Sequence, residues 1–168
     1  MVHLTAVGGL MRLWRISRSN QTALDGAGAE LYGARYSAPG RPLVHFASEP
    51  GLAVLVALRY LPAERDQWPS DAVLGWTDID AEPERIPTAE DEDEIRQWVG
   101  VWLDSSRSLL AAIPSRVLPE ADIVMMNPSH DLAVNVPPLT VRRFDFAECL
   151  HRPPMLDRYK KTADSEEN

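Results

Sequence analysis

The stretch from Gly26 to Leu61 constrains this chain most, because it joins turn-forming residues, a short apolar run and a helix pattern. Arg35 and Tyr36 follow the first glycines, and His45 interrupts the apolar run. Residues without a Cβ, or with a fixed φ, let the backbone turn sharply and approach a ligand closely. They are Gly26, Gly28, Gly33, Pro39 and Gly40. This order is typical of a binding site rather than of a plain core hairpin.

Composition excludes several classes of function. A chain of 168 residues with 45% hydrophobic and 25% charged residues suits one globular domain. Its formal net charge of −8 argues against a nucleic-acid partner, since such proteins usually carry a basic face. The single cysteine, Cys149, forms no internal disulfide, and no clustered His/Cys spacing indicates a metal site. We therefore expect a cytoplasmic protein without a bound metal.

The N-terminal apolar run is interrupted by Arg12 and Arg15, and no stretch of about 18 apolar residues follows. The sequence thus predicts neither export nor membrane insertion.

Hydrophobic patterns predict several strands among few helices. We expect a helical turn over residues 27–32 and helices over 52–61 and 88–103, the second capped by Thr88. The first of these helices is expected to bury Leu52, Leu55, Val56 and Tyr60, or a neighbouring set. Strands are expected over residues 13–16, 42–46, 73–79, 115–118, 123–126 and 140–146. Because strands and helices do not alternate strictly, these elements indicate a mixed α/β or α+β domain.

The glycine pattern is not the fingerprint of a Rossmann fold, because no clear strand precedes it and the third glycine is missing.

Three segments together resemble the RES-domain family of bacterial toxins, which consume NAD+ and resemble ADP-ribosyltransferases in fold. They are LWR at residues 13–15, the stretch from Gly26 to Leu61, and IPSRVLPEADIVMMNPSH at 113–130. Arg35-Tyr36-Ser37 occupies the place of the family's Gly-Gly-Arg-aromatic-Asn run, with Ala34 for the second glycine and Ser37 for the asparagine. The resemblance covers the chain from about Leu13 to Phe146.

The resemblance implies a compact α+β, ADP-ribosyltransferase-like domain with two small sheets around an NAD-binding cleft. On this basis we expect an N-terminal lead-in over residues 1–12, one domain over 13–156 and a polar tail over 157–168.

The resemblance also implies which side chains contact NAD+. Arg15 and Arg35 are expected to face the pyrophosphate, since a guanidinium donates two parallel charge-assisted hydrogen bonds to phosphate. Tyr36 and His45 are expected against the nicotinamide and its ribose. Ser115 is expected to bond a ribose hydroxyl or the carboxamide.

Asn127 lies in the turn over residues 127–130 and is expected to complete the pocket wall as a further NAD+ contact. A tyrosine is common in the family at His45, and histidine keeps an aromatic face with a polar edge. The expected catalytic residues are His45, Ser115, Tyr36 and Glu30.

Each of these residues also fits an ordinary structural role. Arg15 can be a surface arginine at a strand end, Tyr36 a core aromatic, and His45 a satisfied core or edge residue. Ser115 can be a turn residue after proline. We interpret the acidic run over residues 90–94 as a solvated helix start, rather than as a metal or partner site.

One position departs from the family. Val56 stands where a glutamate is normal, and valine neither accepts a hydrogen bond nor stabilises a positive charge. Glu30, Glu49 or Asp25 could supply the carboxylate, or other groups could carry the chemistry, or the protein could be inactive.

These observations together predict a toxin that uses NAD+ to ADP-ribosylate a cytoplasmic protein, with release of nicotinamide. An NAD+ glycohydrolase or phosphorylase remains the alternative. An inactive antitoxin- or nucleotide-binding module is the third possibility. The resemblance further implies a cognate antitoxin that covers the active-site cleft.

Overall fold

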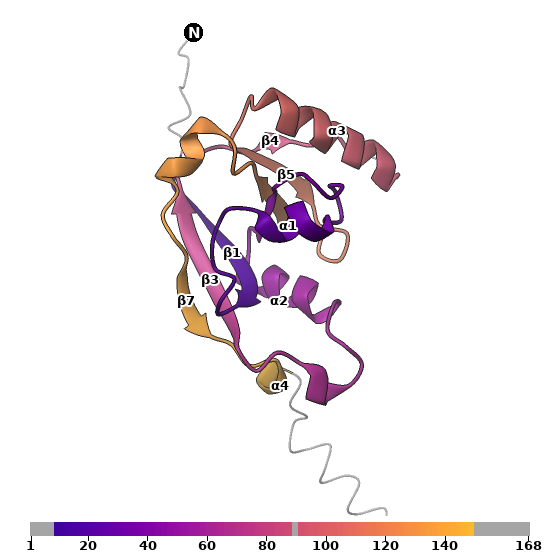
Figure 1. Ribbon diagram of the computed structural model, residues 1–168, viewed down its shortest axis with the longest axis vertical. Helices are drawn as coiled ribbons and strands as arrows, with labels where there is room; N and C mark the ends of the chain where they lie inside the picture. The colour runs from indigo at the N-terminus through magenta and orange to yellow at the C-terminus, as the bar shows by residue number, and fades with distance from the viewer. Residues whose placement is uncertain (1–8, 89–90, 150–168) are drawn as a thin grey trace, which may run out of the picture.

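The computed structural model describes residues 9–88 and 91–149, and it shows an α+β fold built on one seven-stranded sheet (Figure 1). The expected tail over residues 157–168 lies outside the described residues. The strands are β1 (Met11–Arg18), β2 (Val44–Ala47), β3 (Ala72–Ile79), β4 (Glu84–Arg85), β5 (Leu110–Pro114), β6 (Asp122–Met126) and β7 (Thr140–Arg143). The helices are α1 (Ala27–Tyr32), α2 (Pro50–Leu58), α3 (Glu92–Ser105) and α4 (Phe146–Cys149), with short 3₁₀ turns at Arg65–Gln67 and Asp131–Asn135.

The sheet has the order β4-β5-β6-β2-β1-β3-β7, so the expectation of two small sheets is wrong. β1 pairs with β3 along its whole length, from Met11 opposite Ile79 to Arg18 opposite Ala72. β1 meets β2 only with Trp14 opposite Ala47. Local sequence patterns carry no sign of this single long-range pairing, which joins the two halves of the sheet.

The strand expected over residues 115–118 is also wrong, because these residues form part of the turn between β5 and β6. The strand lies just before them, at Leu110–Pro114, and four of its five residues are buried. A continuous apolar run shows no alternation between two faces, so periodicity cannot distinguish it from buried helix.

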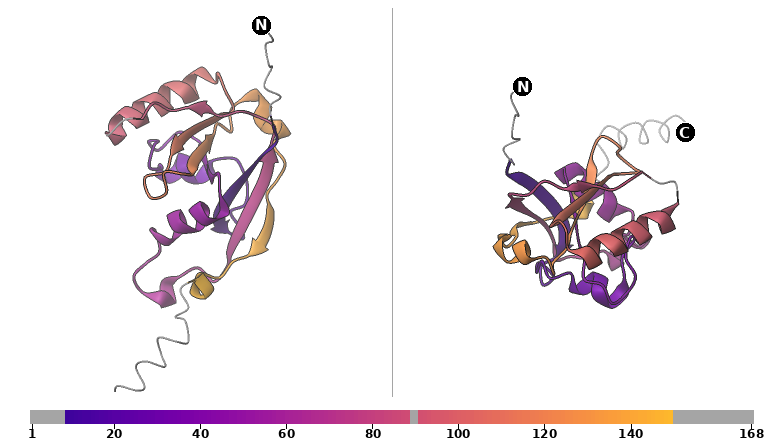
Figure 2. Two further views of the ribbon diagram at one scale, coloured as in Figure 1. Left: turned by 180° about the vertical axis from the view of Figure 1, so that it is seen from behind. Right: turned by 90° about the horizontal axis from the view of Figure 1, so that it is seen from above.

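Helix α2 begins at Pro50, where a residue without a backbone N–H leaves no donor unsatisfied. It buries Leu52 and Ala53, in one apolar cluster with residues of β3 and with Phe144 and Phe146. Leu55 and Tyr60, which were expected on the buried face, are 42% and 71% exposed. α1 and α2 lie on the same side of strands β1, β3 and β7 (Figure 2).

Helix α3 is capped by Asp91 rather than by Thr88, since the Asp91 carboxylate accepts the N–H of Asp93 at 2.9 Å. Its apolar face buries Ile95, Val99 and Trp102 against β5 and β6. Trp98 is only half-buried and stacks on Trp102. Among the described residues, no helix combines the length and the apolar character needed to cross a bilayer.

Candidate active site

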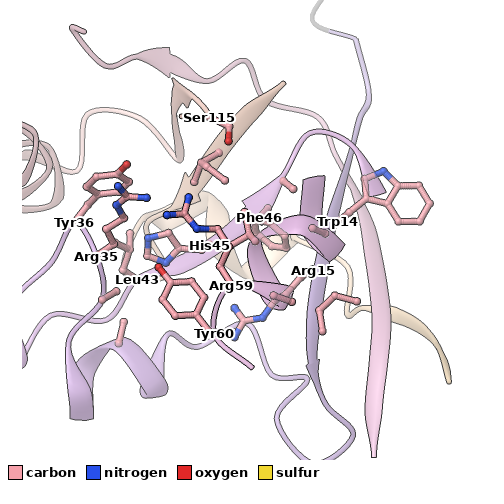
Figure 3. A pocket seen from close by; sticks show the side chains of 18 of the residues that line it. Trp14, Arg15, Arg35, Tyr36, Leu43, His45, Phe46, Arg59, Tyr60 and Ser115 are labelled. Atoms are coloured by element: carbon pink, nitrogen blue, oxygen red, sulfur yellow. The ribbon is translucent and has the colours of Figure 1, made fainter. Parts of the chain in front are cut away.

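A cavity of about 470 Å³ lies beside the junction of β1 and β2 (Figure 3). Its walls come from strands β1, β2 and β6, from α1 and α2 with the segments that follow them, and from the turn between β5 and β6. This volume falls within the range of small-molecule and cofactor sites. Five of the residues expected to contact NAD+ line it together, namely Arg15, Arg35, Tyr36, His45 and Ser115.

The turn after α1 places Arg35 and Tyr36 in the cavity wall. It begins at Gly33, whose φ of +75° favours glycine, and a Cβ there would lie 3.0 Å from the Pro39 ring. Tyr36 is 4% exposed, so it is both a core aromatic and a cavity residue. The Arg35 guanidinium lies over its ring, 5.4 Å from the centroid.

Arg35 is held by an ion pair with Glu92, the first residue of α3. Its Nε and Nη2 donate to the same Glu92 oxygen at 2.9 and 2.5 Å. This hydrogen bond raises the pKa of Arg35 and lowers the pKa of Glu92.

Arg15 lies on β1 opposite Gly75 and is half-buried. Burial lowers the pKa of its guanidinium, and the nearby Asp25 carboxylate partly offsets this effect. Within the described part of the chain it makes no hydrogen bond, so a half-buried cation is left facing the cavity. An anionic ligand group could compensate this charge.

His45 lies on β2 opposite Met125, and its Nε2 is buried with no hydrogen-bond partner among the described residues. Burial, with a smaller effect of the Arg15 charge, lowers the pKa of His45 to about 4. The imidazole is therefore neutral at pH 7 and can exchange a hydrogen bond with a ligand hydroxyl.

Ser115 follows directly after β5 and is 4% exposed. Its N–H donates to the Ala121 carbonyl at 2.8 Å, and its Oγ accepts the N–H of Val117 at 3.3 Å. Ser115 is thus both a turn residue and part of the cavity wall, and its O–H remains able to donate.

Two expected site residues do not line the cavity. Glu30 is exposed on α1. Asn127 is buried at the end of β6, where its amide donates to the Leu103 carbonyl and the Ser106 hydroxyl, both at 3.3 Å. Its own oxygen accepts the N–H of Ser129 at 3.0 Å. These contacts tie Asn127 to the end of α3 and away from the cavity.

None of the described residues that line the cavity is an aspartate or glutamate, and Val56 forms part of the wall. Glu49 is exposed at the N-terminus of α2. Asp25 accepts the N–H of Ala27 at 3.0 Å and acts on Arg15 through its charge, but it lies outside the lining. The three carboxylates considered as substitutes for the family glutamate therefore all lie outside the cavity wall.

Three polar lining residues were missed in the sequence, namely Arg59, Tyr60 and Arg116. Arg59 and Tyr60 directly follow the last residue of α2, three and four positions after Val56. In the helix expected over residues 52–61, this spacing places them on the same face as Val56. That spacing could have revealed them once Val56 was assigned to the site. Within the described residues Arg59 has no ion pair, whereas Arg116 lies 3.5 Å from Glu92.

Comparison with models of known protein families shows to which family the chain belongs. The model of the RES domain matches residues 12–147. The chain belongs to the RES-domain family. RES-domain relatives include a protein named Toxin Res from Photorhabdus laumondii, which is 32% identical over 152 residues, covering 81% of this chain and 93% of the relative. A protein named Prs ADP-ribosylating toxin from a Sphingobium species is 29% identical over 147 residues, covering 78% and 91%.

A solved structure shares the fold of this RES domain. The M. tuberculosis MbcT-MbcA toxin-antitoxin complex contains a chain that matches with a TM-score of 0.59. The match covers 82% of this chain and 84% of that one at 14% sequence identity, so it supports the fold alone.

Proposed function

We propose that this RES-domain protein is the toxin of a toxin–antitoxin pair, and that it cleaves NAD+ and transfers ADP-ribose to a cytoplasmic protein. The observation that carries the proposal is the meeting of Arg15, Arg35, Tyr36, His45 and Ser115 around one cavity. The names of two relatives support parts of this proposal, since Toxin Res names a toxin and Prs ADP-ribosylating toxin names a toxin that transfers ADP-ribose.

Binding of NAD+ follows from the charges in the cavity wall. The pyrophosphate carries two negative charges, and Arg15 and Arg35 offer cations from two different elements of the wall, β1 and the turn after α1. Arg15 has no hydrogen-bonded partner among the described residues, so a phosphate oxygen would compensate its burial. The nicotinamide ribose would then lie near His45 and Ser115.

The reaction breaks the bond between C1 of the ribose and the nicotinamide nitrogen. The electron pair leaves with nicotinamide, which becomes neutral, and oxocarbenium character builds on the ribose. A neutral His45 suits this step, because an imidazolium would repel the developing positive charge. His45 Nε2 and the Ser115 hydroxyl would hold the ribose hydroxyls or the carboxamide during bond cleavage.

The absence of acidic side chains from the described lining favours a docked acceptor over free water. Water is a weak nucleophile that needs a base and a fixed position, whereas a bound protein side chain arrives already positioned. The acceptor nucleophile would form the new bond to C1 and lose its proton to solvent or to a group of its own protein.

Phosphorolysis is the second candidate, and Arg59 favours it. Inorganic phosphate is already anionic and needs no base, and Arg59 is a cavity cation with no ion pair in the described residues. An NAD+ phosphorylase would release nicotinamide and ADP-ribose 1″-phosphate without labelling any protein.

An antitoxin partner is the further part of the proposal. Tyr60 and Val117, both in the cavity lining, are 71% and 40% exposed. Apolar groups at the edge of a cavity suit a covering protein, because their contact with water is lost when the partner binds.

Replacement of Arg35 by alanine tests the proposed site. Loss of a charge-assisted pair to phosphate should weaken NAD+ binding by about 2 to 3 kcal/mol and abolish detectable turnover. Isothermal calorimetry and nicotinamide release measure the two effects. Arg41→Ala is the matched control, since Arg41 also pairs with α3, through Asp104, but lies outside the cavity. Normal turnover in a folded Arg35→Ala variant would contradict the proposal.

A further inference from the structure

We propose that Glu92 is a positioning residue for Arg35, and that it turns one edge of the Arg35 guanidinium toward the phosphates of the substrate. This inference rests on the function proposed above. Glu92 belongs to the acidic start of α3, which the sequence alone indicated as a solvated helix terminus. It is not itself part of the cavity lining.

The hydrogen bonds between the two residues use only one edge of the guanidinium. Arg35 Nε and Nη2 donate to Glu92 Oε1 at 2.9 and 2.5 Å. A guanidinium has five N–H donors in a planar fork, so the Nη1 edge is left over. Because Arg35 lines the cavity, that remaining edge is the one available to a ligand.

The next turn of α3 holds the main chain of Arg35. Arg96, one helical turn after Glu92, donates from Nε to the Arg35 carbonyl at 2.8 Å. Arg96 is in turn held by Asp93 at 3.0 Å. Backbone and side chain of Arg35 are thus fixed from one rigid element, which limits the positions that the guanidinium can take.

Glu92 also connects two walls of the cavity. Arg116, in the turn after β5, lies with its Nη1 3.5 Å from the oxygen that Arg35 binds. Without the carboxylate between them, the two guanidinium groups would repel each other. Glu92 therefore allows both cations to face the same cavity.

The negative charge of the Glu92 carboxylate is stabilised by its surroundings even when no ligand is bound. Hydrogen bonding to Arg35 lowers the pKa of Glu92, with smaller effects of Arg116 and Arg96, so the carboxylate is ionised at neutral pH. The N-terminus of α3 also favours an anion in its first turn. A neutral amide at residue 92 would keep the shape of the side chain and lose this attraction.

The test is the affinity of the full-length protein for ADP-ribose, which contains the pyrophosphate and requires no catalysis. Glu92→Gln should weaken binding roughly threefold to tenfold, as expected for a partly exposed ion pair that orients its partner. Glu92→Asp, which keeps the charge on a shorter side chain, should give a smaller loss. Glu94→Gln, an exposed position in the same helix turn, should bind as the wild type does.

A double variant separates positioning from general stability. In an Arg35→Ala background, Glu92→Gln should cause a much smaller loss of affinity, because only the longer contact of Glu92 with Arg116 remains. Equal affinities of wild type and Glu92→Gln, or an undiminished loss in the Arg35→Ala background, would overturn this inference alone. A wild-type protein that does not bind ADP-ribose would overturn the proposed function as well.

Discussion

Val56 lies on α2 and Arg59 directly follows the last residue of this helix, and both contribute to the cavity wall. At these positions the site combines an apolar group with a cation, whereas the family resemblance implies a carboxylate at residue 56. Because the other ionisable lining groups are arginines, tyrosines and a neutral histidine, the electrostatics suit an anionic substrate better than they suit activation of water.

Restoring the family residue should therefore change the rate. We expect Val56→Glu to accelerate nicotinamide release by about tenfold or more, since a carboxylate beside the ribose stabilises positive charge in the transition state. Steady-state kinetics with NAD+ measures the effect. Val56→Gln controls for shape, and Leu55→Glu places the same charge at a neighbouring residue outside the lining. A slower Val56→Glu variant with unchanged NAD+ affinity would show that this position has no electrostatic role.

His45 gives a prediction for stability against pH. Its folded pKa of about 4 lies below the ordinary value of 6.5, so the unfolded chain binds more protons between these two pH values. The contribution of His45 is complete above pH 6.5 and is lost as the pH falls toward 4. From pH 6.5 to pH 5 the free energy of unfolding should fall by about 2 kcal/mol more in the wild type than in His45→Gln.

Denaturant titrations of both proteins at several pH values provide that comparison. Parallel pH profiles for the wild type and His45→Gln would mean that the histidine is solvated and titrates normally.

At the scale of elements, α3 contributes both to the core, through its apolar face, and to the candidate site, through its first turn. Its apolar face buries Ile95, Val99 and Trp102 in the core beneath β5 and β6. Its first turn holds Arg35 through Glu92. The position of the site therefore depends on the packing of this helix.

The two tryptophans of α3 should differ when truncated. Trp102 is fully buried and donates from Nε1 to Ser108 at 2.8 Å, so Trp102→Ala should cost about 3 to 5 kcal/mol of unfolding free energy. Trp98→Ala should cost only about 1 to 2 kcal/mol, because the half-buried ring loses mainly its contacts with Trp102 and Arg107. Chemical denaturation measures both free energies of unfolding. Equal destabilisation by the two substitutions would contradict the assignment of Trp102 to the core and of Trp98 to a half-buried position.

At the scale of the whole molecule, the cavity lies where the two halves of the sheet meet. Trp14 opposite Ala47 is the point of contact between β1 and β2, and both residues also line the cavity. Arg15 follows Trp14 on one half of the sheet, and His45 lies two residues before Ala47 on the other. The two halves of the sheet thus bring the Arg15 cation and the neutral His45 side chain to the same cavity from distant parts of the chain.

Much of the fold and part of the candidate site could be predicted from local sequence patterns. The helical turn over residues 27–32 and the strands near residues 73–79 and 123–126 are where hydrophobic patterns and turn residues placed them. The glycines and the Arg35-Tyr36 pair marked one wall of the cavity, because turn chemistry acts over a few residues.

The rest depends on contacts between residues far apart in the sequence. The joining of the strands into one sheet depends on the pairing of β1 with β2, and the ion pair of Arg35 with Glu92 spans 57 positions. Asn127 matched the family pattern, yet its position is set by the end of α3 rather than by the cavity. A local sequence pattern does not identify a contact partner that lies far away in the sequence.

The most direct test of the central claim is to incubate the protein with NAD+ labelled in the adenylate phosphate and a cytoplasmic extract, and to follow label and nicotinamide together. Transfer predicts label in a small number of proteins, in proportion to the nicotinamide released, and no label with Arg35→Ala. Rapid nicotinamide release without any labelled protein would contradict transfer, and would move the activity to hydrolysis or phosphorolysis of NAD+.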